Sequence, residues 1–191
     1  MSQAFSIKIN FDIYLLQSVK ILIMKYQHTT PLSRKNLITP QGFKKLQDEF
    51  SKLKFDERPK VVEVVSWAAS NGDRSENGDY IYGKKKLREI DKRLEFLGKR
   101  IELAEVIDPL SQKAKHIEFG ATVLIEDDDG NQKSYIIVGG DESEPEKGKI
   151  SWVSPIAKAM LKAKEGDYVT YKAPSGEKGL LIIKIEYRTI E

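Results

Sequence analysis

Apolar residues in the first third of the chain recur at alternating steps of three and four. Four of them mark one seam: Phe43, Leu46, Phe50 and Leu53. This is the heptad spacing of a helix that packs against another helix. Thr39 before Pro40 is typical of a helix N-cap followed by the first helical residue. Pro59 interrupts the pattern, which predicts a kink or restart near Glu57-Arg58-Pro59.

A second heptad segment follows a cluster of turn-forming residues at 70–73. Its apolar positions hold the three-four spacing up to Asp108-Pro109: Leu87, Ile90, Leu94, Leu97, Ile101 and Ala104. Two such helices joined by a short loop predict an antiparallel hairpin. A helix of about 30 residues is roughly 45 Å long, so the loop near Asp73 becomes the tip of a probe. We interpret Phe50, Trp67 and Phe96 as packing residues of this hairpin.

The period of the pattern changes from Ile117 onward. Five segments are typical of strands: Ala121–Glu126, Ser134–Val138, Lys149–Val153, Tyr168–Lys172 and Leu180–Tyr187. Ser154-Pro155 predicts the start of a helix between the third and fourth strands. Asp127–Asn131 is typical of a hairpin turn and lacks the spacing of a calcium-binding EF-hand loop.

These patterns predict an α+β protein. An antiparallel α-helical coiled-coil hairpin domain covers residues 31–108, a linker covers 109–116, and a small α+β domain with an antiparallel sheet covers 117–191. Residues 1–30 form an N-terminal extension whose apolar run, 11–24, is shorter than the roughly 20 residues of a membrane-spanning helix. That run is either an added helix or strand, or it precedes a true translation start at Met24. We favour the start at Met24.

Composition narrows the classes of function. The 191 residues include no cysteine, which excludes disulfides, thiolate zinc sites and cysteine nucleophiles. The net charge is only +3, so nucleic-acid binding requires local clusters of Lys and Arg. Charged residues make up 32% of the chain, which fits the large exposed surface of a helical hairpin. We expect a cytoplasmic protein that does not bind membranes.

Two carboxylates in the tip loop, Asp73 and Glu76, are candidates for chemistry. On spacing alone they are best explained as a capping box, with Asp73 at the N-cap and Glu76 three residues later. Their place at the end of a stalk favours a second interpretation, in which they hold one Mg²⁺ together with water and phosphate. The loop by itself is an incomplete metal site, so another molecule would have to complete it, as in two-metal phosphodiester hydrolysis.

The helix after the loop is rich in basic residues. The block Lys84-Lys85-Lys86 near the tip resembles a patch that contacts phosphates, whereas the later cations fit a solvated face with pairs such as Glu89–Arg93 and Glu95–Lys99. Tyr80 and Tyr82 beside the block either close the top of the hairpin or stack on a base.

The whole segment Trp67–Asp91 closely resembles the tip of the Gre transcript cleavage factors. Three further segments resemble the same family: Glu57-Arg58-Pro59, Ser154–Ala159 and Glu165-Gly166-Asp167. The resemblance covers about residues 35–188. The Arg-Ser between the two acids and the lysine-rich run resemble the GreB branch of the family.

This resemblance implies a coiled-coil N-terminal domain, an FKBP-like C-terminal domain and binding at the secondary channel of bacterial RNA polymerase. It implies that Asp73 and Glu76 help hold the second Mg²⁺, shared with polymerase, and orient the attacking water. The polymerase would then cleave the 3′ end of the backtracked nascent RNA, so the protein itself is an accessory factor and not an enzyme. We expect a monomer.

The resemblance also assigns contacts. The residues expected to contact RNA at the tip are Arg74, Ser75, Asn77, Tyr80, Lys84, Lys85, Lys86 and Arg88. Ser154 and Pro155 are expected to dock on polymerase.

Three positions depart from the family pattern. Gly78 stands where Ala is usual and Gly83 where GreB often has Asn, and both lower helix propensity and predict a more flexible tip. Val153 replaces a polar or acidic residue next to Ser154-Pro155, which affects the expected docking contact.

Two alternative functions stay open. A secondary-channel regulator that does not promote cleavage would share the architecture, but such relatives lack the tip acids. A peptidyl-prolyl isomerase is suggested by the FKBP-like resemblance. The aromatic residues of this C-terminal half, however, are spread along the strands and outline no obvious catalytic pocket.

Overall fold

The computed structural model describes residues 36–70 and 74–190. The N-terminal extension with Met24, and the tip residue Asp73, lie outside the described residues. Within them, no helix combines the length and apolar character needed to cross a bilayer.

The first arm of the hairpin consists of three successive helical segments: α2 (Pro40–Lys52), η1 (Leu53–Glu57) and α3 (Arg58–Ser70). Thr39 is the N-cap of α2, with its side chain accepting from the Gly42 N–H and Pro40 at the first helical position, as predicted. The segment η1 is a π-helical turn, in which the Arg58 N–H donates to the Leu53 carbonyl five residues back. Pro59 has no N–H to donate, so the irregularity predicted here falls just before it.

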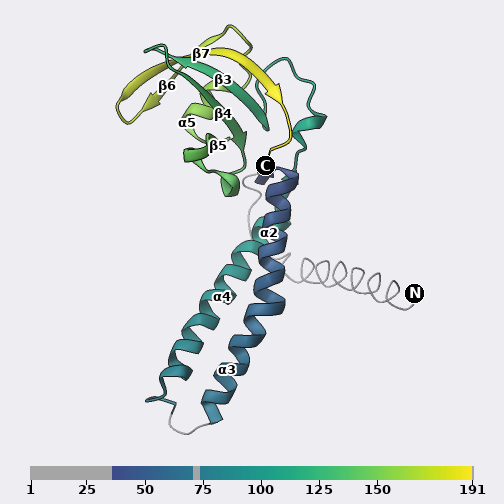
Figure 1. The fold of residues 1–191 in the computed structure, drawn as a ribbon, viewed down its shortest axis with the longest axis vertical. Coiled ribbons are helices and arrows are strands. Elements are labelled where there is room, and N and C mark those ends of the chain that lie inside the picture. The colour runs from purple at the N-terminus through teal and green to yellow at the C-terminus, as the bar shows by residue number, and fades with distance from the viewer. Residues whose placement is uncertain (1–35, 71–73, 191) are drawn as a thin grey trace, which may run out of the picture. The chain divides into compact units, whose positions relative to one another are not determined.

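The second arm is one helix, α4 (Gly78–Glu102), which runs antiparallel to the first arm (Figure 1). Contacts between the arms join residues that are progressively closer in sequence toward the tip. Arg93 forms a bidentate ion pair with Glu49, and Asn77 donates to the Ala68 carbonyl. Between them, Arg58 pairs with Asp91 at 2.7 Å. These polar contacts define the register in which the two arms pair.

The heptad seam is buried at Leu46, Phe50, Ile90 and Leu97. Trp67 is 61% exposed and Phe96 44% exposed, so their interpretation as packing residues is wrong. Two helices share only a narrow contact strip, and each residue step rotates the side chain by about 100°. Ala68 occupies that strip completely, which leaves its neighbour Trp67 on the outside.

The second heptad pattern overestimates the length of α4. Ala104, predicted as helical, lies in a short strand, β2 (Ala104–Val106), that pairs in parallel with β1 (Asn36–Ile38). The pairing joins segments about 70 positions apart, so the local pattern gave no sign of it. A short 3₁₀ turn, η2 (Pro109–Ser111), follows β2.

The C-terminal part is a five-stranded sheet in the order β5-β4-β3-β7-β6. Its strands are β3 (Ala121–Asp127), β4 (Gln132–Val138), β5 (Lys149–Ser151), β6 (Tyr168–Ala173) and β7 (Gly176–Tyr187). The strands pair antiparallel except β4 with β5, which are parallel because the chain crosses over through η3 (Gly140–Glu142) and η4 (Pro145–Lys147).

Helix α5 (Pro155–Met160) completes the core of this sheet. The buried side chains are Ile117, Ala121, Val123, Ile125, Ile137, Ile150, Ala157, Met160, Ala163, Leu180 and Ile182. In the β3–β4 turn, one carboxylate oxygen of Asp127 accepts from the backbone N–H groups of Asp129 and Asn131. These bonds hold the pKa of Asp127 below its usual value and identify the acidic run as a hairpin turn.

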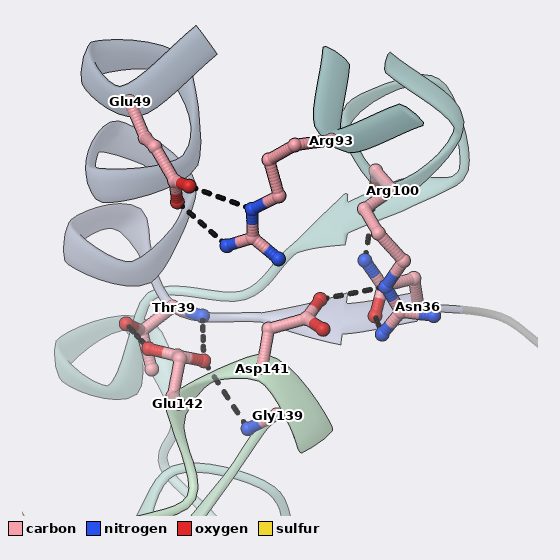
Figure 2. Close-up of polar contacts among 8 residues, drawn as sticks. All are labelled: Asn36, Thr39, Glu49, Arg93, Arg100, Gly139, Asp141 and Glu142. Atoms are coloured by element: carbon pink, nitrogen blue, oxygen red, sulfur yellow. Dashed lines mark hydrogen bonds and ion pairs between the residues drawn. The ribbon is translucent and has the colours of Figure 1, made fainter. Parts of the chain in front are cut away.

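Polar contacts join the base of the hairpin to η3 (Figure 2). The Glu142 carboxylate accepts from the Thr39 N–H, the Thr39 hydroxyl and the Gly139 N–H. Arg100 of α4 pairs with Asp141 at 2.7 Å and also donates to Asn36. The sheet domain is therefore anchored to the start of α2 and the end of α4, at the opposite end of the hairpin from the tip.

Candidate functional site

The tip of the hairpin comprises the end of α3, the turn at 74–76 and the start of α4 (Figure 1). Arg74, Ser75 and Glu76 are all exposed. Of the two acids proposed for chemistry, Glu76 therefore presents its carboxylate to solvent, while Asp73 lies outside the described residues.

Helix α4 is capped by Asn77. The Asn77 Oδ1 accepts from the Tyr80 N–H at 3.2 Å, and the helix begins at Gly78. The capping-box interpretation of Asp73 and Glu76 is therefore wrong, because Glu76 precedes the cap instead of lying at the third helical position. Asn is as good an N-cap as Asp, so spacing alone did not distinguish the two.

Three successive carbonyls at the end of α3 accept hydrogen bonds from side chains of the tip. Ser70 Oγ donates to the Trp67 carbonyl at 2.6 Å, and Asn77 Nδ2 donates to the Ala68 carbonyl at 3.0 Å. Arg74 Nε lies 3.4 Å from the Ala69 carbonyl. The last turn of a helix leaves its carbonyls without partners, and here the tip supplies those partners itself.

Tyr80 is the aromatic centre of the tip. The Arg74 guanidinium lies 5.9 Å from its ring centroid and the Lys84 ammonium 5.3 Å, both within range of a cation–π interaction. Arg74, Asn77 and Tyr80, which the resemblance proposed as RNA contacts, therefore all make contacts that build the tip. This result favours the interpretation of Tyr80 as a residue that closes the hairpin.

Positive charge is concentrated on the first turns of α4. Lys84, Lys85, Lys86 and Arg88 are exposed, and none of them pairs with a carboxylate among residues 36–70 and 74–190. Farther from the tip the cations are compensated. Lys99 pairs with Glu95 as predicted, and Arg93 pairs with Glu49 of α2 instead of Glu89. The Arg93 guanidinium holds the pKa of Glu49 below its usual value.

The two glycines near the tip have different roles. A Cβ atom on Gly83 would lie 2.6 Å from Cγ2 of Val65, whereas one on Gly78 would meet no atom within 4 Å. Gly83 therefore allows α3 and α4 to approach closely. It serves packing, which is a different role from the tip flexibility predicted from its low helix propensity.

The donor chemistry of the tip suits a hard cation such as Mg²⁺, which takes oxygen ligands. Among the described residues, no three His, Asp or Glu side chains gather in a group that could hold a metal ion. Glu76 can contribute one carboxylate, and the sequence places Asp73 three residues before it. Such a pair suits a shared site in which a partner provides the remaining ligands.

The expected docking residues lie at the start of α5. Ser154 Oγ accepts from the Ala157 N–H at 3.3 Å, which makes it the N-cap, and Pro155 is the first helical residue, as predicted. Val153 is 48% exposed in the preceding turn. The Ser154 hydroxyl oxygen thus stabilises the helix, and the exposed apolar group of this turn is Val153.

Sequence reasoning missed the double role of Asn77 and the cluster of Glu142, Asp141 and Arg100 that anchors the sheet domain. An Asn directly before a helical pattern is a recognisable N-cap signal, so the capping of α4 by Asn77 could have been predicted from the sequence. The bond to Ala68 and the anchoring cluster depend on contacts between distant segments.

Comparisons with known proteins agree with this architecture. The family model "Transcription elongation factor, N-terminal" matches residues 36–106, and "Transcription elongation factor, GreA/GreB, C-term" matches residues 112–187. Transcription elongation factor GreB of Neisseria meningitidis serogroup B is 49% identical over 158 residues, which are 82% of this chain and 97% of the relative. GreB of Yersinia pestis is 42% identical over 84% of this chain and 94% of its own length.

A solved structure, that of GreA factor homolog 1 of Thermus thermophilus, is 20% identical. It covers 80% of this chain and 99% of its own, with a TM-score of 0.39.

Proposed function

The chain belongs to the GreA/GreB family of transcription elongation factors, and from that premise we propose that it binds bacterial RNA polymerase and stimulates cleavage of backtracked nascent RNA. In this proposal the hairpin enters the secondary channel and its tip reaches the catalytic centre. The RNA 3′ end that has been displaced from that centre is removed, and elongation resumes. The polymerase performs the hydrolysis, and this protein supplies the missing ligands.

The observation that carries the proposal is an exposed Glu76 at the tip, followed along the first turns of α4 by a basic patch with no carboxylate partner in the described chain. We define the basic patch as Lys84, Lys85, Lys86 and Arg88. A carboxylate and a phosphate-binding surface at one end of a stalk match the two needs of phosphodiester cleavage, which are metal ligands and a positioned phosphate backbone.

Each part of the tip has a distinct task in this proposal. Asp73 and Glu76 would hold a Mg²⁺ together with ligands from polymerase, and their carboxylates would orient the attacking water. When bound, Mg²⁺ supplies the activation of water and the stabilisation of the leaving oxygen. The basic patch and Ser75 contact the RNA segment, and the loop at Val153–Pro155 docks on the polymerase surface.

The register of the hairpin supports delivery of the carboxylates to a fixed point. The ion pairs Glu49–Arg93 and Arg58–Asp91 connect the arms along the stalk. The close contact between Gly83 and Val65 connects them near the tip. A stalk whose arms are joined at several points along its length is suited to present the tip carboxylates at one place.

Cleavage by a halted, backtracked elongation complex tests the proposal. Asp73→Ala and Glu76→Ala should each reduce stimulated cleavage by at least about a hundredfold, because losing a metal ligand costs several kcal/mol of transition-state stabilisation. Binding to polymerase, measured separately, should remain. Glu63→Ala is the matched control, since Glu63 is an exposed carboxylate on α3 away from the tip.

Full cleavage with the Asp73→Ala, Glu76→Ala double variant would disprove this mechanism. A different outcome is that the native protein binds polymerase without stimulating cleavage and without changing how the polymerase pauses. That result would favour the alternative, a regulator that occupies the secondary channel without promoting cleavage.

A further inference from the structure

Asn77 joins the two arms of the hairpin where the turn at 74–76 meets α4. Its Oδ1 accepts from the Tyr80 N–H of α4 at 3.2 Å, while its Nδ2 donates to the Ala68 carbonyl of α3 at 3.0 Å. One planar amide therefore serves the N-terminus of one helix and the C-terminus of the other. Rotation of that amide would break both hydrogen bonds together.

The environment of Ala68 makes this contact specific. Ala68 has no solvent-exposed surface, and Asn77 is itself half-buried between the arms. A carbonyl in such a place needs a donor, because an unsatisfied buried acceptor is costly. Asn77 supplies that donor across a separation of nine residues.

Glu76 is peptide-bonded to Asn77, so the amide bridge also fixes the point from which the Glu76 side chain projects. On the other side of the turn, Arg74 contacts the Ala69 carbonyl and the Tyr80 ring. The turn at 74–76 is thereby held at both ends against the helices that flank it.

We propose that Asn77 is a positioning residue for transcript cleavage, which holds the Glu76 carboxylate in the place where it meets the shared metal. This inference rests on the proposed function of Glu76. It also changes the role of Asn77 from an RNA contact to an internal support of the tip. The amide is committed to the two helices, whereas an RNA contact would need it free.

The two functions of the amide can be separated by substitution. Asn77→Ser keeps a good N-cap oxygen but lacks the amide nitrogen that reaches Ala68, and it adds no charge. Asn77→Ala removes both contacts. Asn131→Ser is the matched control, because Asn131 is an exposed Asn whose amide also donates within a turn, in the sheet domain.

The experiment measures cleavage by a backtracked elongation complex at saturating factor, over a range of Mg²⁺ concentrations. For Asn77→Ser we expect a maximal rate at least about tenfold lower, since displacement of a catalytic group by about 1 Å can cost a hundredfold. The Mg²⁺ concentration for half-maximal rate should rise, while affinity for polymerase stays within about twofold. Asn131→Ser should match the native protein in all three measurements.

A purely structural role would give a different result. It would lower thermal stability and the fraction of folded factor, while at saturating factor the maximal rate and the Mg²⁺ dependence would equal those of the native protein. A native maximal rate and a native Mg²⁺ dependence for Asn77→Ser would therefore overturn the inference. Circular dichroism verifies folding, and Asn77→Ser retains the cap if Asn77→Ala fails to fold.

Parallel measurements on Glu76→Ala separate this inference from the proposed function. If Glu76→Ala cleaves normally, the proposed function fails. If Glu76→Ala is inactive while Asn77→Ser is native, only the positioning role fails.

Discussion

Replacing each of the two tip glycines by alanine should have opposite effects on stability, although both lie in the same helix. The backbone gain is similar in kind, because Ala is favoured over Gly in a helix by up to about 1 kcal/mol. The difference comes from space. The new methyl at Gly83 meets Val65 at 2.6 Å, and the methyl at Gly78 meets nothing within 4 Å.

Val65 has little freedom to move away. A valine in a helix strongly prefers one rotamer, so the overlap forces a shift of the arms. Overpacking of this kind typically costs about 1–3 kcal/mol, which exceeds the gain in propensity. We expect Gly83→Ala to destabilise the protein by about 1 kcal/mol. Gly78→Ala should stabilise it by roughly 0.5 kcal/mol, since Gly78 is the first helical residue and gains less than an interior position.

Urea unfolding followed by circular dichroism at 222 nm measures both effects, because most helical residues in the described part of the chain belong to the hairpin. The midpoint should fall for Gly83→Ala and rise for Gly78→Ala, with unchanged slopes. Val65→Ala in combination with Gly83→Ala provides the control. The double variant should be more stable than the sum of the single effects predicts. An increase in stability for Gly83→Ala would refute the close-approach argument.

Three further predictions concern other parts of the chain. Glu142→Ala should destabilise the junction of the two domains by about 2 kcal/mol, because the carboxylate accepts several hydrogen bonds, including two from Thr39; thermal unfolding should show the hairpin and sheet domain separating into two transitions. The Glu49–Arg93 pair should contribute less than about 1 kcal/mol, since both side chains are partly exposed. That contribution should be present above pH 4.5 and be lost as the pH falls through the lowered pKa of Glu49. Neutralising the basic patch should weaken RNA engagement and flatten its dependence on salt concentration.

Each of these has a control. For the junction, Glu146→Ala removes an exposed acid from the same region, and an equal effect would contradict the hydrogen-bonding role of Glu142. For the ion pair, Glu49→Gln should remove the acid-dependent component, and an unchanged pH profile would contradict the assignment. For the basic patch, Lys92→Ala lies on the same helix farther from the tip, and an equal loss of salt dependence would indicate general charge and not a localised patch.

The helices and their caps were largely determined by local sequence. Thr39-Pro40 and Ser154-Pro155 begin helices as predicted, because an N-cap hydroxyl and a proline at the first helical position satisfy purely local requirements. The heptad spacing gave the hairpin for the same reason, since a stripe of apolar residues on each helix must be buried against a partner. The tip motif indicated the family through its residues alone.

Only the tertiary structure decided which of several similar residues caps a helix, is buried or allows close packing. Asp73 and Asn77 are both capable N-caps, and in the folded chain Asn77 caps α4 while its amide nitrogen also donates to the Ala68 carbonyl of the other arm. Trp67 and Ala68 are adjacent and apolar, yet only Ala68 fits the narrow strip between the helices. Gly83 is a weak helix former in the sequence and a packing requirement beside Val65. In each case the deciding contact joins different elements of the fold, so its geometry exists only after the chain has folded.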